Sequence, residues 1–129
     1  MIVVDTSAII AILEWEKEAD QFLSTLVKAP DVAISTVTML ECYSVAFRRH
    51  KQDGLDRLQG VLQEVNLRIR TFTEDNLSLA KQALVKYGKG VHKAGLNFGD
   101  CASYALAKSL DAPLLFKGDD FSETDVKRC

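Results

Sequence analysis

The chain opens with a short apolar run that ends abruptly in an acid. Residues 2–4 form a continuous apolar run that is typical of a strand buried on both faces of a sheet. Asp5 follows at once, and Thr6 and Ser7 offer hydroxyl groups that can cap a helix whose apolar body is residues 8–13. A buried strand that leads directly into a helix is typical of sheets with helices on both faces.

This alternation continues along the chain. Apolar or alternating runs predict further strands at residues 32–34, 67–72 and 112–116. Helical spacing predicts helices at residues 16–28, from about 36 to Gly54, and at residues 55–65, 74–87 and 100–110. The tail beyond Ser122 is expected to add a short edge strand at Val126 or to fray. We therefore expect one α/β domain over residues 1–129, an α/β/α sandwich with a mostly parallel central sheet.

Composition excludes several classes of protein. Apolar residues make up 47% of the 129 residues, which is enough for a sizeable core and argues against disorder. The three cysteines, an odd number without paired spacing, indicate a reducing compartment and no zinc site. No basic segment precedes the first apolar run, and no apolar stretch approaches the ~20 residues that span a bilayer. We therefore expect a soluble, cytoplasmic protein with no membrane contact.

Basic residues cluster twice in a chain whose net charge is −2. Bulk attraction to nucleic acid is therefore excluded, but a local basic patch is not. The clusters are either solvated helix ends or contacts to a nucleic-acid backbone. They comprise Arg48, Arg49, His50 and Lys51, and then Lys86, Lys89, His92 and Lys93.

Four acids stand where such a fold would place them at an edge. Asp5 ends the first strand, Glu41 interrupts an apolar segment, Asp100 follows Gly99, and Asp119 comes just after the last apolar run. Acids at the carboxyl ends of parallel strands point into a crevice above the sheet. Several acids in one crevice repel each other unless a hard cation such as Mg²⁺ or Mn²⁺ neutralises them. The pattern favours a metal-dependent phosphodiesterase, although each acid could instead have a separate structural role.

Other hydrolytic chemistries lack their motifs. A haloacid-dehalogenase-like phosphatase needs a second Asp two residues after the first, where this chain has Ser7. A phosphate-binding glycine loop would end in Lys followed by Ser or Thr, and a serine hydrolase would carry its serine between two glycines. Neither motif is present.

At these residues the chain resembles the PIN domain family, and most closely the ribonuclease toxins of VapBC toxin–antitoxin pairs. Four stretches carry the resemblance: residues 1–13, 40–41, 96–107 and 113–121. The first and third are highly specific. By position, Asp5, Glu41 and Asp100 match the acids of the family, and either Asp119 or Asp120 matches its variable fourth acid, with Asp119 favoured. Lys117 departs from the family pattern, in which many members carry a hydroxyl residue there.

The resemblance implies an endoribonuclease that depends on Mg²⁺ or Mn²⁺ and arrests translation by cutting structured tRNA or rRNA. It also implies a homodimer and inhibition by a VapB-type antitoxin. In the resulting hypothesis Asp5 and Asp100 bind the ion directly, and Glu41 and Asp119 bind it directly or through water. Thr6, Ser7 and Asp120 would support the site, with Thr6 and Ser7 equally well explained as helix caps.

Two alternatives remain open from the sequence. The first is a catalytically inactive PIN-like module that binds RNA or a protein, against which the intact acids argue. The second, weaker alternative is a metal-dependent phosphatase that acts on small esters. The sequence does not identify the RNA target or the number of metal ions.

Overall fold

Four short strands form one parallel sheet in the order β3-β2-β1-β4. The computed structural model describes residues 1–129. Val3 in β1 pairs with Ala33 in β2 on one side and with Leu114 in β4 on the other. The predicted sheet is therefore confirmed, and it is entirely parallel. The strands are β1 (Ile2–Val4), β2 (Val32–Ser35), β3 (Leu67–Arg70) and β4 (Leu114–Leu115).

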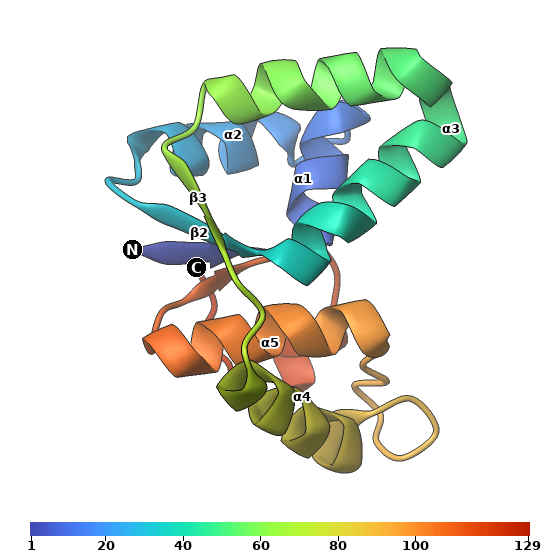
Figure 1. Cartoon of the computed structure of the whole chain (residues 1–129), viewed down its shortest axis with the longest axis vertical. Helices are drawn as coiled ribbons and strands as arrows, with labels where there is room; N and C mark the ends of the chain where they lie inside the picture. Colours follow the sequence, from blue (N-terminus) through green and yellow to red (C-terminus); the bar gives the residue numbers. More distant parts are fainter.

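Helices cover both faces of this sheet. Figure 1 shows α1, α2 and α3 on one face and α4 and α5 on the other, which confirms the sandwich. The helices are α1 (Thr6–Leu13), α2 (Ala19–Lys28), α3 (Thr36–Gln63), α4 (Glu74–Tyr87) and α5 (Phe98–Leu110), followed by the 3₁₀ helix η1 (Asp120–Glu123). None of them is long and apolar enough to cross a lipid bilayer.

Strand residues alternate between two hydrophobic cores. Val4 and Leu115 pack into the core under α1, α2 and α3, whereas Val3 and Leu114 pack into the core under α4 and α5. Successive side chains of a strand point to opposite faces, so a strand between two helical layers must be apolar at every position. The run at the start of the chain is therefore continuously apolar because β1 is buried on both faces, as the sequence predicts.

The long helix α3 differs from the two helices that the sequence predicts on either side of Gly54. It is bent at Lys51, whose φ of 54° and ψ of −142° are not helical. The bend turns the second half of α3 back over α1, where Arg57 Nη2 donates to the Leu13 carbonyl oxygen at 2.7 Å. Gly54 lies just beyond the bend, against the backbone of Ala46. The glycine thus permits a close approach and does not end a helix.

Three boundaries also differ from the predictions. Helix α2 begins at Ala19 instead of residue 16, because the chain reverses after α1 through Trp15, whose φ is 55°. Strands β3 and β4 are shorter than expected. The tail neither frays nor forms a strand at Val126; Arg128 makes a single parallel bridge to Leu114 at the edge of the sheet.

We predict opposite effects for two alanine substitutions in α3. A Cβ at Gly54 would lie 2.3 Å from the Ala46 carbonyl oxygen, whereas a Cβ at Gly60 would meet nothing within 4 Å. Gly54→Ala should lower the free energy of unfolding by about 1–3 kcal/mol through overpacking. Gly60→Ala, the matched control, should raise it by about 0.5–1 kcal/mol through its better helix propensity. Urea denaturation measures both, and equal effects would contradict the close packing at the bend.

Candidate functional site

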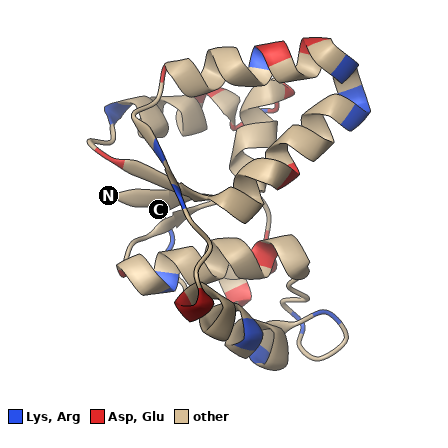
Figure 2. Cartoon of the chain, in the orientation of Figure 1, with Lys and Arg blue, Asp and Glu red and all other residues tan.

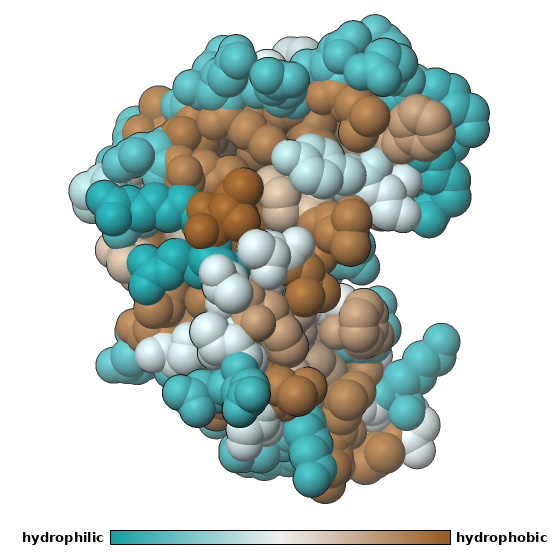
Figure 3. Space-filling model, in the orientation of Figure 1, coloured by the Kyte–Doolittle hydropathy of each residue, from teal (hydrophilic) through white to brown (hydrophobic).

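The predicted acids come from four elements that meet at the carboxyl end of the sheet. Asp5 directly follows β1, Glu41 lies on α3, Asp100 lies on α5, and Asp119 and Asp120 lie where η1 begins after β4. In the strand order, β1 is flanked by β2 and β4, and the chain crosses to the other face of the sheet between β3 and β4. Open parallel sheets bind ligands at such a reversal of strand order. The space-filling view shows the surface hollowed between α3 and the part built by α4 and α5 (Figure 3).

Asp5 is buried and held by two donors. Only 3% of its surface is exposed. Its Oδ2 accepts from the Ser7 backbone N–H at 3.0 Å, and its Oδ1 accepts from the Ser103 hydroxyl at 2.5 Å. Asp5 is therefore itself the cap of α1, and the prediction that the Thr6 or Ser7 hydroxyl caps this helix is wrong. A carboxylate accepts the Ser7 N–H better than a hydroxyl would, since it carries a charge at the positive end of the helix.

The Glu41 side chain extends from α3 toward Thr6 of α1 and Gly99 of α5. Its Oε1 accepts from the Thr6 hydroxyl at 2.5 Å. Its carboxylate also lies against Gly99, where an added Cβ would be 2.5 Å from Oε2 and 2.7 Å from Oε1. Gly99 therefore leaves the space in which Glu41 approaches the start of α5, directly beside Asp100. Thr6 thus supports an acid, and its hydroxyl is not a helix cap.

Asp100 is the acid whose ionisation is most disturbed. It lies at the third position of α5, where its Oδ2 accepts from the Asn97 backbone N–H at 3.0 Å and Asn97 caps the helix in return. Burial, followed by the charges of Asp5, Asp120 and Glu41, raises the pKa of Asp100 to about 7, in spite of the bond from Asn97. The charges of Asp5, Asp120 and Glu41 therefore lie close enough to act on Asp100. That the predicted acids form one site stays a prediction.

Of the two candidates for the fourth acid, Asp120 is the one whose charge acts on Asp100. Asp119 precedes η1, is exposed, and makes no capping hydrogen bond. Lys117 does not enter the site: its Nζ donates to Glu16 at 2.7 Å, while its backbone N–H donates to the Ser7 hydroxyl at 2.9 Å. Ser7 thus ties the loop after β4 to the start of α1.

No basic side chain neutralises these acids. None of the salt bridges involves Asp5, Glu41, Asp100, Asp119 or Asp120. No three His, Cys, Asp or Glu side chains are arranged so that they could hold a metal ion as they stand. Glu41 accepts from the Thr6 hydroxyl and Asp100 from the Asn97 N–H, so each of these acids has its own hydrogen-bond donor.

Sequence reasoning missed two contributors to the site and the role of a third. Ser103 holds Asp5, Thr38 lies 3.2 Å from the Ser103 hydroxyl oxygen, and Gly99, noted in the sequence only as the neighbour of Asp100, makes room for Glu41. The available signal was helical spacing. Thr38 precedes Glu41 by three residues on α3, and Ser103 follows Asp100 by three on α5, so each hydroxyl shares a helix face with an acid.

The buried cysteines are structural, and part of the first basic cluster contacts the protein itself. Cys42 and Cys101 are buried, and burial raises the pKa of Cys42 to about 12 and of Cys101 to about 11, so neither is a reactive thiolate. Lys and Arg residues gather at the bend of α3 (Figure 2). There Arg49 and His50 contact Glu14 of the α1–α2 turn, at 3.4 Å and 2.9 Å.

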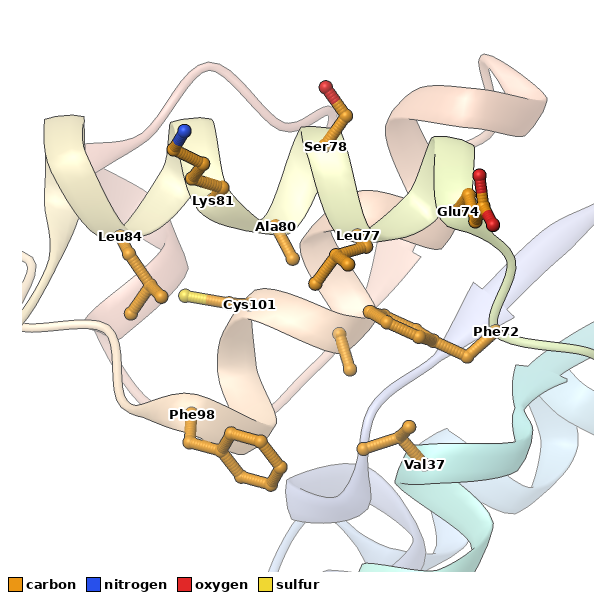
Figure 4. Close-up of a pocket in the computed structure, with 11 residues that line it drawn as sticks. Val37, Phe72, Glu74, Leu77, Ser78, Ala80, Lys81, Leu84, Phe98 and Cys101 are labelled. Carbon is orange, nitrogen blue, oxygen red and sulfur yellow. The ribbon is translucent and has the colours of Figure 1, made fainter.

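An apolar pocket of about 730 Å³ adjoins the acids. Figure 4 shows Val37 of α3 and Phe98 of α5 facing Leu77 and Leu84 of α4 across it. Phe98 is 79% exposed and Leu77 is 59% exposed, although both are large and apolar. The sequence analysis did not predict this pocket.

The raised pKa of Asp100 predicts an unusual pH dependence of stability in the absence of metal. An ordinary Asp in the unfolded chain ionises near pH 3.8, whereas the folded state keeps the Asp100 proton until about pH 7. The folded state therefore binds more protons between these values, and the free energy of unfolding should fall as the pH rises through this window. Asp100→Asn, which cannot ionise, should remove that part of the slope in urea denaturation with EDTA. An unchanged slope would contradict the clustering of the acids.

Comparisons with known proteins agree with this architecture. The PIN domain family model matches residues 2–127. Ribonuclease VapC of Mycolicibacterium smegmatis is 41% identical over 124 residues, which cover 96% of either chain. Ribonuclease VapC36 of Mycobacterium tuberculosis is 36% identical over 126 residues, which cover 97% of this chain and 91% of the relative.

Solved structures share the fold at lower identity. The M. tuberculosis toxin VapC20, described as cleaving the sarcin–ricin loop, has a TM-score of 0.80 at 19% identity and covers 100% of this chain and 98% of its own. VapBC2 of Rickettsia felis, bound to a DNA fragment from its promoter, has a TM-score of 0.75 at 19% identity, covering 99% and 96%. The family model and the relatives above 30% identity lead to one conclusion: this chain belongs to the PIN domain family, among relatives that are named VapC ribonucleases.

Proposed function

We propose that this chain is a divalent-metal-dependent endoribonuclease, the toxin of a type II toxin–antitoxin pair. The observation that carries the proposal is the group of Asp5, Glu41, Asp100 and Asp120: the charges of the other three act on Asp100, and none of the four forms a salt bridge. The names of the relatives at 36–41% identity support ribonuclease activity. Structured RNA, either tRNA or rRNA, is the proposed substrate, and the sarcin–ricin loop named for VapC20 supports that choice.

The donor set fits a hard cation. Carboxylate oxygens are the ligands that Mg²⁺ and Mn²⁺ prefer, and the site lacks the thiolate or imidazole groups that would favour zinc. Asp5 and Asp100 would hold the ion, with Glu41 and Asp120 as further ligands directly or through water. A small inward movement of the side chains is required, since Glu41 and Asp100 are now turned toward Thr6 and Asn97. When bound, such an ion lowers the pKa of a water molecule and polarises the scissile phosphate.

The chain's own residues orient these acids. The Ser7 N–H and the Ser103 hydroxyl hold the two oxygens of Asp5, so this carboxylate is preorganised. The N-terminus of α5 adds a positive end of a helix dipole close to Asp100. Asp100 must lose its proton to act as a ligand, so the affinity for the metal should increase as the pH rises through about 7.

Two protein partners belong to the proposal. A VapB-type antitoxin is supported by the toxin–antitoxin complex from Klebsiella pneumoniae, which has a TM-score of 0.73, and by the VapBC2 structure. We place its contact near Trp15, which is 81% exposed beside a hollow between α1, α2 and α3. A homodimer is supported by the exposed apolar side chains around the pocket of Figure 4.

The direct test of the proposal is Asp5→Asn. Loss of the carboxylate charge should lower cleavage of structured RNA by more than about 100-fold, beyond the roughly 10–100-fold cost of a group that only supports a ligand. EDTA should abolish cleavage by the unsubstituted protein, and Mg²⁺ or Mn²⁺ should restore it. Asp53→Asn, at an exposed acid on α3 outside the candidate site, is the control. Full cleavage by Asp5→Asn, or cleavage in EDTA, would reject the metal-dependent nuclease.

A second pair of variants distinguishes the two candidates for the fourth acid. Because the charge of Asp120 is among those that raise the pKa of Asp100, Asp120→Asn should weaken Mn²⁺ binding and cleavage by roughly 10-fold or more. Asp119→Asn should have a much smaller effect, and both variants should retain the stability of the unsubstituted protein, since both residues are exposed. A larger loss of Mn²⁺ binding and cleavage in Asp119→Asn than in Asp120→Asn would instead support Asp119 as the fourth acid, as the sequence favours.

A further inference from the structure

We infer that Thr38 and Ser103 are positioning residues that hold Asp5 in the orientation required for metal binding. We call this pair the hydroxyl relay. The inference rests on the proposed metal site and extends it to two side chains that contact no substrate. It starts from the bond between the Ser103 hydroxyl and Asp5 Oδ1 and from the 3.2 Å contact between the Thr38 and Ser103 hydroxyl oxygens.

The donor and acceptor in each hydrogen bond of the relay follow from the number of hydroxyl protons available. Ionised Asp5 can only accept hydrogen bonds, so the single hydroxyl proton of Ser103 points to Oδ1. Thr38 must then donate its own proton to Ser103. Successive hydroxyls that donate in one direction polarise each other and strengthen the last bond of the chain. The relay therefore fixes the direction in which Asp5 Oδ1 points, as a preorganised ligand requires.

The burial of both hydroxyls requires such an explanation. Thr38 and Ser103 are each 0% exposed. Placing a hydroxyl in a core costs free energy unless a partner compensates for the lost water. Valine and alanine would fill the same places without that cost. The two hydroxyls are satisfied by each other and by Asp5, so a hydrogen bond to the acid accounts for both.

A second serine on α5, Ser109, shows the usual hydrogen bond of a serine to its own helix. Ser109 donates to the Leu106 carbonyl oxygen, three residues earlier, at 3.0 Å. This local bond is the usual role of a serine inside a helix. Ser103 instead points away from its own helix, from α5 to the residue that ends β1. Ser109 is therefore a matched control for a serine-to-alanine change in α5.

The relay also joins the two helical layers at the site. Thr38 belongs to α3 on one face of the sheet and Ser103 to α5 on the other. Asp5 is held from the α5 side, while Thr6, its neighbour, holds Glu41 of α3. Each of these two acids is thus fixed by a hydroxyl from a different element, and the relay sets the position of Asp5 relative to both layers.

The test compares variants of the full chain by calorimetric titration with Mn²⁺ at fixed pH, together with urea denaturation in EDTA. Ser103→Ala should weaken Mn²⁺ binding by roughly 10–100-fold, and Thr38→Val, which keeps the shape of the side chain, by up to about 10-fold. Thr38→Ser, which keeps the hydroxyl but loses a methyl group, should bind Mn²⁺ as the unsubstituted protein does. Ser109→Ala should also leave the affinity unchanged.

The comparison of Thr38→Val with Thr38→Ser separates positioning from stability. A merely structural role would make the affinity follow the packing, so Thr38→Ser would be the weaker binder. Normal Mn²⁺ affinity in Thr38→Val and in any folded Ser103→Ala would overturn the inference while leaving the metal site intact. Failure of the unsubstituted protein to bind Mn²⁺ or to cut RNA would instead overturn the proposed function. If Ser103→Ala does not fold, the two Thr38 variants decide the question.

Discussion

The burial of one carboxylate governs the arrangement of the whole site. Asp5 ends the central strand β1, caps α1 through the Ser7 N–H, and accepts the Ser103 hydroxyl from α5. A buried carboxylate is tolerated only where donors replace its lost water. The same residue therefore fixes the entry into the first helix, the distance between β1 and α5, and the place where further acids can converge. Burial, and after it the charges of the other acids, raises the pKa of Asp100.

Much of the fold could be predicted from local patterns. The apolar run at residues 2–4 required a strand buried on both faces, and the two cores of the sandwich confirm it. Thr73 and the glycine after Tyr87 correctly delimit α4. The bend at Lys51 could not be predicted, because a positive φ at a lysine is not favoured locally and the second half of α3 is held by a contact to another element, from Arg57 to the Leu13 carbonyl oxygen. The single-residue bridge of Arg128 likewise depends on the position of β4.

The candidate site was likewise predictable only in part. Asp5, Glu41 and Asp100 could be selected because each acid stands at a strand end, in an apolar segment or after a glycine. The sequence favoured Asp119 over Asp120, whereas the structure shows that the charge of Asp120 acts on Asp100, an effect that depends on the fold of the short 3₁₀ turn. Thr38 and Ser103 were missed because a hydroxyl in a small-residue helix face resembles ordinary packing until its partner across the interface is known.

The two-core construction has a consequence for how this protein would lose activity. Thr6 and Glu41 lie on helices of one layer, Asp100 and Ser103 lie on a helix of the other, and Asp5 follows the strand between them. The bonds and contacts between them cross the boundary between the layers at its rim. A slight sliding of one layer on the other would therefore separate the acids while each helix remained intact. Activity in such a molecule would depend on how the two helical layers pack, and it would be lost before the helices and strands unfold.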